Sequence, residues 1–252
     1  MSPKATFRFY EELNDFLPVN KKKTAFSYEF TGKPSVKDAI ESIGIPHIEV
    51  DLILVNSESV TFSYHLKDGD MLSIYPVFES LDISNATHLR KKPLREPKFI
   101  LDVHLGRLSK YLRMLGFDTL YESNYDDSTI IKTAREQKQT ILTRDVVLLK
   151  NNEVTHGYWI RSQNSFDQAI EVIIYFDLFS SIKPFSRCIL CNGIIQSITK
   201  ESVLHLLKPN TQHYYDEFFQ CMSCKKVYWK GSHYERMERL IEKLKITLSN
   251  MD

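Results

Sequence analysis

Alternation of apolar and polar residues predicts two short strands near the N-terminus, in ATFRFYEEL (5–13) and KTAFSYEF (23–30). The next segment, SVKDAIESIGI (35–45), predicts a helix that begins after a Ser35 N-cap and stops at Gly44. Its apolar residues share one face: Val36, Ala39, Ile40 and Ile43. Two further strands are expected in VDLILVN (50–56) and DGDMLSIYPVF (68–78), which gives the order ββαββ.

From Pro97 onward, predicted strands alternate with predicted helices. The strands are KFILDV (98–103), FDTLY (117–121), QTILT (139–143) and HGYWIRS (156–162). The first helix carries an apolar stripe and stops at Gly116, the second starts at an Asp127 N-cap, and the third opens with the capping-box pair Ser165 and Gln168. The stripe consists of Leu105, Leu108, Leu112 and Leu115. Strands separated by helices predict an α/β fold with a parallel sheet covered on both faces.

The composition, with 42% hydrophobic and 26% charged residues, is that of an ordinary globular protein. No run of 18 apolar residues is present, so no membrane helix is expected. The first ten residues, MSPKATFRFY, lack the apolar core of a signal peptide, and we therefore expect a cytoplasmic protein.

Four segments are predicted: a β-rich domain at 1–82, a linker at 83–97, an α/β domain at 98–182, and a cysteine module with a C-terminal helix at 183–252. The stretch 83–98 contains two prolines and five basic side chains. Residues 1–85 carry 8 Lys and Arg against 13 Asp and Glu, whereas residues 183–252 carry 11 against 7. The basic rear of the chain therefore suits a polyanionic partner.

Three aspartates fall where ligands bind in parallel α/β folds, outside the carboxyl ends of the strands. Asp102 closes the first strand of that domain, Asp127 opens the helix after the second, and Asp145 follows the third. Each could serve only as a helix cap. Carboxylates gathered at one edge, however, need a cation, and their hard oxygens suit Mg²⁺ or Mn²⁺. Such a site can hydrolyse a phosphodiester.

Basic residues accompany this edge. Arg107, Lys110 and Arg113 recur every three residues on the helix face opposite the leucine stripe, where they would bind substrate phosphates or simply be solvated. His104 lies nearby, as a substrate contact or a surface histidine. Arg144 would either pair with Asp145 or clamp a phosphate.

All four cysteines lie in two CxxC pairs, Cys188 with Cys191 and Cys221 with Cys224. Four thiolates can surround Zn²⁺ tetrahedrally and leave no open position, so a structural zinc ribbon is predicted. The adjacent Tyr228 and Trp229 would either cover this small ribbon or stack on bases, with lysines 225, 226 and 230 beside them. An amphipathic helix follows, with Met237, Leu240, Ile241 and Leu244 facing inward.

The stretches FILDVHLGRLSKYLRMLGFDTLY (99–121), DDSTII (126–131) and ILTRDVVLL (141–149) resemble the Mut-seven C-terminal RNase family, a branch of the PIN-like nucleases. The resemblance runs from about Lys98 to Tyr234. It implies a three-layer PIN-like fold, an acidic metal-binding centre and ribonuclease activity. The family's aspartates fall on Asp102, Asp127 and Asp145, with Asp126 as the neighbour that makes the alignment ambiguous. Asp167 is the nearest candidate for a fourth acidic group, or a residue of the first turn of its helix.

The N-terminal domain resembles the ubiquitin-like β-grasp fold, and LVNSESVTFSYHLKDGDMLSIYPVF (54–78) is similar to small sulfur carriers of the MoaD/ThiS type. Those carriers end in Gly-Gly, whereas this chain continues as PVFESLDIS (76–84), so sulfur transfer is not expected. The resemblance also makes this domain a known companion of the nuclease domain. Two functions follow: a metal-dependent ribonuclease whose zinc ribbon helps to hold RNA, or a non-catalytic RNA- or ribosome-binding adaptor whose β-grasp domain recruits a protein partner.

Overall fold

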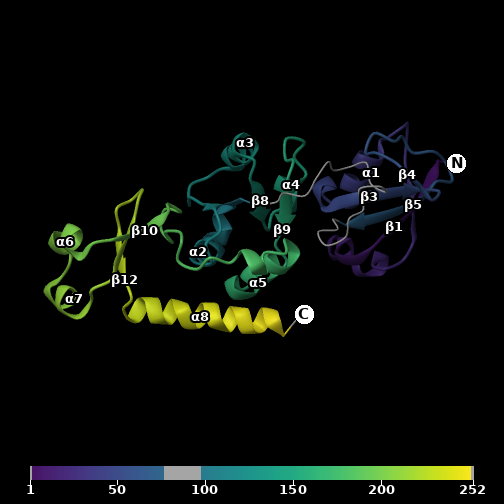
Figure 1. Cartoon of the computed structure of the whole chain (residues 1–252). Helices are drawn as coiled ribbons and strands as arrows, with labels where there is room; N and C mark the ends of the chain where they lie inside the picture. Colours follow the sequence, from purple (N-terminus) through teal and green to yellow (C-terminus); the bar gives the residue numbers. More distant parts are fainter. Residues whose placement is uncertain (1, 77–97, 251–252) are drawn as a thin grey trace. The chain divides into compact units, whose positions relative to one another are not determined.

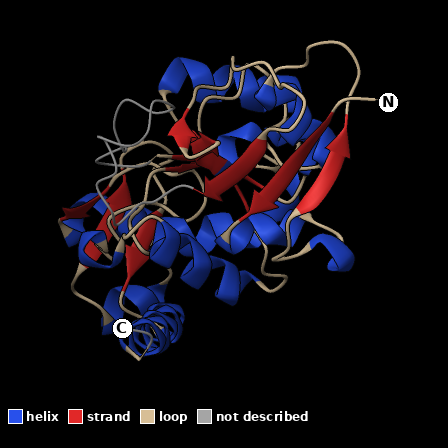
Figure 2. Cartoon of the chain, turned by 90° about the vertical axis from the view of Figure 1, so that its right-hand side faces the viewer, coloured by secondary structure: helices blue, strands red, loops and turns tan. Residues whose placement is uncertain are grey.

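The chain folds into two compact units, each built from two separate stretches of sequence. Figure 1 labels the helices and strands and colours them along the sequence. The computed structural model describes residues 2–76 and 98–250. The first unit contains Met1–Glu96 and Ile131–Trp159, and the second contains Pro97–Ile130 and Ile160–Asp252. The predicted linker, 83–97, lies outside the described residues. Helices and strands are mixed throughout the chain, which confirms the α/β class (Figure 2).

The N-terminal part of the first unit is a five-stranded sheet with one α-helix; it contains the predicted order ββαββ and one additional short strand, β4. Its strands lie in the order β2-β1-β5-β3-β4, with β1 and β5 parallel and the other pairs antiparallel. Their bounds are β1 Lys4–Phe9, β2 Phe26–Glu29, β3 Val50–Val55, β4 Glu58–Ser59 and β5 Met71–Pro76. Three short 3₁₀ helices interrupt the connections: η1 Glu11–Phe16, η2 Val19–Lys21 and η3 His47–Glu49.

Helix α1, Val36–Ile43, begins and ends where the sequence predicts. The Ser35 hydroxyl accepts the Asp38 N–H while the Asp38 carboxylate accepts the Ser35 N–H, which closes a capping box. Gly44 ends the helix at φ 121°, a conformation that favours glycine. Because Val36, Ala39 and Ile40 point inward, α1 covers one face of the sheet and completes a core of its own.

The remainder of the first unit contains a parallel strand pair, β8 Thr140–Thr143 with β9 Gly157–Trp159, joined through helix α4 Val146–Leu149. The second unit contains another parallel pair, β6 Phe99–Leu101 with β7 Thr119–Leu120. Helix α3, Asp127–Gln137, spans the boundary between the two units in the sequence. Both pairs confirm the parallel arrangement predicted from the alternation of strands and helices.

In the second unit, the 3₁₀ turn η4, Val103–Leu105, leads into α2, Gly106–Met114, which packs against α5, Ser165–Tyr175. The predicted leucine stripe is fully buried: Leu105, Leu108, Leu112 and Leu115. Gly116 follows α2 at φ 100°. The N-cap of α5 differs from the expectation: the Asn164 side chain accepts the Phe166 and Asp167 N–H groups, so the predicted Ser165–Gln168 capping box is wrong.

The C-terminal part of the second unit is an antiparallel sheet in the order β10-β11-β12 with small helices and one long one. Its elements are β10 Ile195–Ile198, α6 Lys200–Val203, η6 Leu204–Leu206, α7 Pro209–Tyr214, β11 Phe218–Cys221, β12 Val227–Trp229 and α8 Ser232–Ser249, preceded by η5 Phe179–Ser181. Helix α8 packs against α5 and buries Ile241, Leu244 and Leu248. Met237 and Leu240 are half-buried on the same helix, as the predicted inward face requires. Among the described residues, no helix is both long enough and apolar enough to cross a membrane.

Candidate functional site

Asp102 follows β6 directly, and its side chain is 5% exposed. Its backbone carbonyl accepts the Leu105 N–H at 2.9 Å and so closes the 3₁₀ turn. In the described chain, the Asp102 carboxylate makes no capping hydrogen bond to that turn. The alternative that Asp102 is only a cap is therefore wrong, and a buried carboxylate remains at the carboxyl end of a parallel strand.

The neighbouring aspartates at the start of α3 have different positions. The Asp126 carboxylate accepts the Thr129 N–H at 2.8 Å and the Ser128 hydroxyl at 3.0 Å. Hydrogen bonding by the Thr129 side chain, followed by that of the Thr129 N–H and the Ser128 hydroxyl, holds the pKa of Asp126 below its usual value. Asp126 is thus the N-cap of α3, and the prediction that Asp127 is the cap is wrong: Asp127 is the first residue of the helix.

Asp145 ends the turn that leaves β8. Its backbone N–H donates to the Thr143 hydroxyl at 2.9 Å, and its carboxylate accepts the Val147 N–H at 2.7 Å. Asp145 is therefore the N-cap of α4, which was one of the two roles that the sequence allowed. Its side chain is also exposed to solvent. Within the described residues, Arg144 forms no ion pair with Asp145, which leaves its other predicted role, contact with a phosphate.

The three aspartates are divided between the two units. Asp102 and Asp127 belong to the second unit and Asp145 to the first. Their convergence on one metal ion therefore stays a prediction. Asp167, the candidate for a fourth acidic group, lies in the first turn of α5, where its carboxylate accepts the Asn164 amide.

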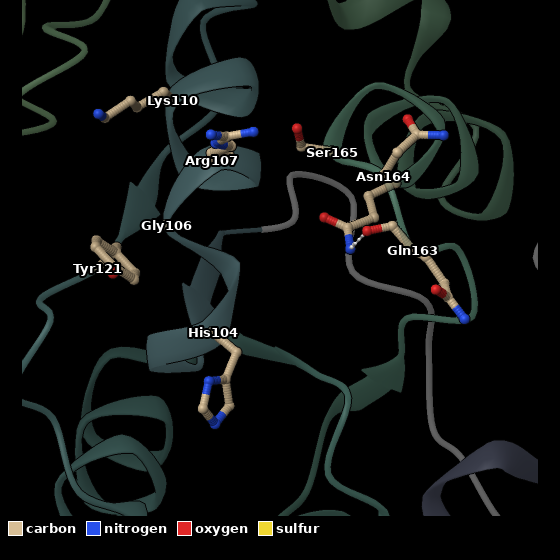
Figure 3. Close-up of a pocket in the computed structure, with 9 residues that line it drawn as sticks. His104, Gly106, Arg107, Lys110, Tyr121, Gln163, Asn164 and Ser165 are labelled. Carbon is tan, nitrogen blue, oxygen red and sulfur yellow. Dashed lines mark hydrogen bonds between the residues drawn. The ribbon is translucent and has the colours of Figure 1, made fainter.

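A cleft of about 650 Å³ opens beside the start of α2 (Figure 3). One wall carries three side chains that are or can become cationic, His104, Arg107 and Lys110, all of them exposed. In Figure 3 the Arg107 guanidinium extends toward Ser165, whereas the Lys110 side chain points away from it. The charged side chains that line this cleft are all basic, so it suits an anion.

The opposite wall is built from amides and a hydroxyl: Gln163, Asn164, Ser165 and Gln168. Asn164 is engaged as the cap of α5, and the Gln168 amide donates to the Ser162 carbonyl at 3.0 Å. This wall is therefore held in place by the start of α5. Sequence reasoning assigned Ser165 and Gln168 only to a cap and did not single out Gln163 or Asn164, because polar residues at the start of a helix usually indicate only a cap.

Gly106 and Tyr121 form the floor of the cleft. The Tyr121 hydroxyl donates to the Val103 carbonyl at 3.1 Å, and its ring crosses directly over Gly106. A Cβ atom at position 106 would lie 2.5 Å from the Tyr121 oxygen, so the Tyr121 side chain would have to shift. Glycine at the first turn of α2 thus permits this contact.

Arg113 does not share the exposed face of Arg107 and Lys110, and that prediction is wrong. Arg113 is 4% exposed, and its guanidinium donates to the carbonyls of Thr119 at 2.9 Å and Leu190 at 2.8 Å. Burial holds the pKa of Arg113 below its usual value. With its donors used inside the protein, Arg113 does not serve as a contact for substrate.

A second set of polar contacts joins β7 to the first cysteine pair. Asn192 accepts the Thr119 N–H at 3.0 Å and donates to the Asp118 carboxylate at 2.7 Å. Arg187 pairs with the same carboxylate at 3.1 Å and donates to the Asn192 carbonyl at 3.0 Å. Together with Arg113, these contacts fix the first cysteine pair to the α/β part of the second unit.

The four cysteine sulfurs, of Cys188, Cys191, Cys221 and Cys224, all lie within 4.8 Å of one another. The Cys188–Cys224 distance is 3.7 Å and the Cys191–Cys221 distance is 3.4 Å. A tetrahedral ion with Zn–S bonds of about 2.3 Å needs sulfurs about 3.8 Å apart. The cluster therefore fits a metal such as zinc.

The two cysteine pairs have the same backbone conformation. The carbonyls of Cys188 and Cys221 accept the N–H four residues later at 2.9 and 3.0 Å, and their own N–H groups donate to the carbonyl five residues later at 2.7 and 2.9 Å. Asn192 and Lys225, each directly after the second cysteine, adopt positive φ of 66° and 60°. Such paired turns direct both thiols of each pair to one point.

The thiols resist simultaneous ionisation when no cation is bound. Burial opposes ionisation of Cys188, but hydrogen bonds, that of the Tyr228 hydroxyl first, outweigh it and lower the pKa of this thiol to about 7. Burial, with contacts to neighbouring thiols, raises the pKa of Cys191 to about 12. Since metal ligands must be thiolates, a bound cation is what would hold all four in that form.

Comparison with known protein families matches the description "Mut7-C RNAse domain" to residues 97–241, more than half of the chain. The chain belongs to the Mut7-C RNAse domain family. The preceding residues, 2–82, match the description "Mut7-C ubiquitin". Searches of curated proteins and of solved structures gave no match.

The Mut7-C RNAse match covers the three aspartates, the cleft and all four cysteines. The recognised family and its ubiquitin-like companion are thus confirmed. The compact units divide the chain differently, because residues 131–159 of the Mut7-C RNAse region group with the ubiquitin-like segment.

Around the cysteine cluster of this Mut7-C RNAse domain, the Tyr228 hydroxyl lies 2.9 Å from the Cys188 sulfur. Tyr228 therefore covers the cluster. Trp229 is 37% exposed, and Lys226 lies over the Tyr228 ring at 5.9 Å. The ribbon thus presents a cation and an aromatic ring at its surface.

Proposed function

We propose that the chain is a metal-dependent ribonuclease in which Asp102, Asp127 and Asp145 hold Mg²⁺ or Mn²⁺. The observation that carries this proposal is the Mut7-C RNAse match over residues 97–241, which includes all three. The donor set fits, because carboxylate oxygens are the ligands that these hard cations prefer. The buried Asp102 carboxylate, at a strand end, supports it further. When bound, the ion would activate water and stabilise the charge of the phosphodiester.

The residues of the chain then have distinct roles. The Asp145 carboxylate is oriented by the Val147 N–H, so its position is set before the ion binds. Arg107 and Lys110 hold phosphates in the cleft, and Arg144 contacts a further phosphate beside Asp145.

The four cysteines hold structural Zn²⁺, since four thiolates leave no position for substrate. The ribbon aids RNA binding through exposed Lys225 and Lys226. Because the cluster needs reduced thiols, we place the protein in the cytoplasm.

Asp102→Asn and Asp145→Asn test the nuclease assignment. Each removes one charge from the metal site at constant size, so Mn²⁺-dependent cleavage of pooled cellular RNA should fall by at least about 100-fold, as loss of a catalytic charge does. Circular dichroism and zinc content should stay those of the wild type. Full cleavage by both variants would contradict the assignment. RNA binding without cleavage under any divalent ion would favour the adaptor, with the ubiquitin-like domain recruiting a protein partner.

Arg107→Ala combined with Lys110→Ala tests the cleft in the Asp145→Asn background, where RNA remains intact. For each phosphate that the variant no longer neutralises, the slope of log affinity against log salt should become shallower by about 0.7 for single-stranded RNA. Fluorescence anisotropy with a labelled oligoribonucleotide measures this slope. Lys245→Ala, an exposed lysine of α8, is the matched control. An equal slope in the cleft variant and this control would remove the cleft from the RNA path.

A further inference from the structure

Strand β9 is fixed at its end by the ubiquitin-like segment. The Trp159 N–H donates to the Glu49 carboxylate at 2.7 Å, and Glu49 is 1% exposed. Glu49 is the last residue of η3, which packs against β9. A buried carboxylate therefore provides the partner for a strand N–H that the sheet itself does not use.

Apolar groups of the same segment surround this hydrogen bond. The rings of Phe16 and Trp159 lie 4.7 Å apart at 39°. Ile48, 4% exposed, approaches the backbone of β9 so closely that a Cβ atom at Gly157 would lie 2.7 Å from its Cδ1. Glycine in this strand thus permits the close packing of η3.

Two lysines add contacts on either side. The Lys150 ammonium donates to the Glu41 carbonyl at 2.9 Å, and the Lys37 ammonium donates to the Asn152 amide oxygen at 2.7 Å. The segment between α4 and β9 is therefore held by α1 as well as by η3.

Trp159 connects this contact to the proposed catalytic turn. Its indole N–H donates to the Arg144 carbonyl at 3.2 Å, and Trp159 is the register partner of Thr143 in the β8–β9 pair. The Thr143 hydroxyl in turn accepts the Asp145 N–H at 2.9 Å. Both polar atoms of the Arg144–Asp145 peptide group are thus held: the carbonyl by the Trp159 indole, and the N–H by Thr143, the register partner of Trp159.

We propose that the ubiquitin-like segment, residues 2–76, is a positioning element for Asp145, acting within the same chain through Glu49 and Trp159. This inference rests on the proposed function, in which Asp145 holds the catalytic metal. Glu49 and Phe16 fix the Trp159 backbone and ring, and the indole fixes the turn that presents the Asp145 carboxylate. The side chains of Glu49 and Ile48 are buried in this contact and so are not available to a separate partner protein.

Trp159→Phe is the sharpest test, because phenylalanine keeps a ring against Phe16 and removes only the indole N–H and part of the ring. Tyr28→Phe in β2 is the matched control, since it removes one hydrogen bond, to Ser42, in the same unit and outside the contact with Trp159. Full-length proteins are compared in two measurements. The first is hydrogen exchange at the Val147 amide in buffer without Mn²⁺ or Mg²⁺, and the second is the Mn²⁺ concentration that gives half-maximal RNA cleavage.

In Trp159→Phe the turn is less fixed, so the Val147 amide should exchange about tenfold faster than in the wild type. Half-maximal cleavage should need about tenfold more Mn²⁺. A factor of this size is typical of the loss of one neutral hydrogen bond. A variant that merely lost stability would speed exchange throughout the first unit, including β1 and β5. Exchange and Mn²⁺ dependence equal to those of Tyr28→Phe would overturn the proposal.

Glu49 supplies a second, independent pair of variants. Glu49→Gln keeps an oxygen at the acceptor position and should retain the protection of Val147, whereas Glu49→Leu should lose it. Equal protection in both would also overturn the proposal. If the wild type cleaves no RNA, the ribonuclease assignment fails, while the exchange measurement still decides whether Glu49 and Trp159 position the turn.

Discussion

At the scale of single residues, Asp126 and Asp127 show why adjacent aspartates are not equivalent. The Asp126 carboxylate accepts hydrogen bonds from Thr129 and Ser128. Asp127 is the next residue and the first of the helix, so its side chain points in a different direction from that of Asp126. The cap and the proposed metal ligand are therefore separable by mutation.

Asp126→Ala should destabilise α3 and leave the Mn²⁺ dependence of cleavage intact, whereas Asp127→Asn should do the reverse. The pKa of Asp126 is lowered in the folded state, so its contribution is complete above the unfolded pKa and is lost as the pH falls through the folded pKa. Thermal melts should thus show a gap between wild type and Asp126→Ala at pH 7 that closes on acidification. A gap that is constant with pH would contradict the cap.

The sequence could not separate these two residues. Asp is favoured both as an N-cap and in the first turn of a helix, and a shift of one residue exchanges the two positions. The same ambiguity affected Ser165, because Asn164 is an equally good cap and stands directly before it. Helix existence depends on many residues and was predictable, while the cap depends on one hydrogen bond.

At the scale of elements, helix α2 has a leucine face whose burial was predictable and a basic face on which the position of Arg113 was not. The leucine stripe repeats at helical spacing, and all four leucines are buried. Arg113 repeats with Arg107 and Lys110, yet it points to the backbone carbonyls of β7 and of the first cysteine pair. The Thr119 carbonyl lies beyond the end of the helix, and the Leu190 carbonyl lies 77 residues away in the sequence, so the helical repeat does not reveal them.

Arg113→Met should lower the free energy of unfolding by about 3 kcal/mol, because it leaves several buried carbonyls without donors. Lys110→Met, on the exposed face of the same helix, should lower the free energy of unfolding much less. Urea unfolding of the two variants measures the difference. Since Arg113 holds the carbonyl of Leu190, its variant should also release zinc faster to a chromogenic chelator. Equal stability of the two variants would show that the buried network contributes little.

At the scale of the whole molecule, the cysteine ribbon has little core of its own. Its buried apolar residues are Val203, Leu207 and Phe218. Spacing of the cysteines predicted the cluster correctly, since CxxC pairs are local and metal geometry is strict. The division into units was not predictable in the same way, because residues 131–159 group with a distant segment through tertiary contacts.

Removal of zinc at neutral pH should unfold the ribbon and spare the N-terminal sheet. Structural zinc contributes about 10–16 kcal/mol in small zinc domains, more than three buried side chains supply. Hydrogen exchange after chelation should lose protection in β10, β11 and β12, while β1 and β5 keep theirs. Cys191→Ser should give the same pattern without a chelator. Unchanged protection in the ribbon would contradict a structural metal.

The interleaving of the two units has a consequence for synthesis on the ribosome. The N-terminal sheet has a complete core of its own, so it can fold once residue 76 has emerged. Residues 131–159 emerge only after 97–130, which belong to the other unit. Synthesis proceeds at about 5–20 residues per second, so the sheet can fold several seconds before β9 is made. The surface formed by Phe16, Ile48 and Glu49 is then already folded when β9 leaves the exit tunnel, and β9 can pack against it.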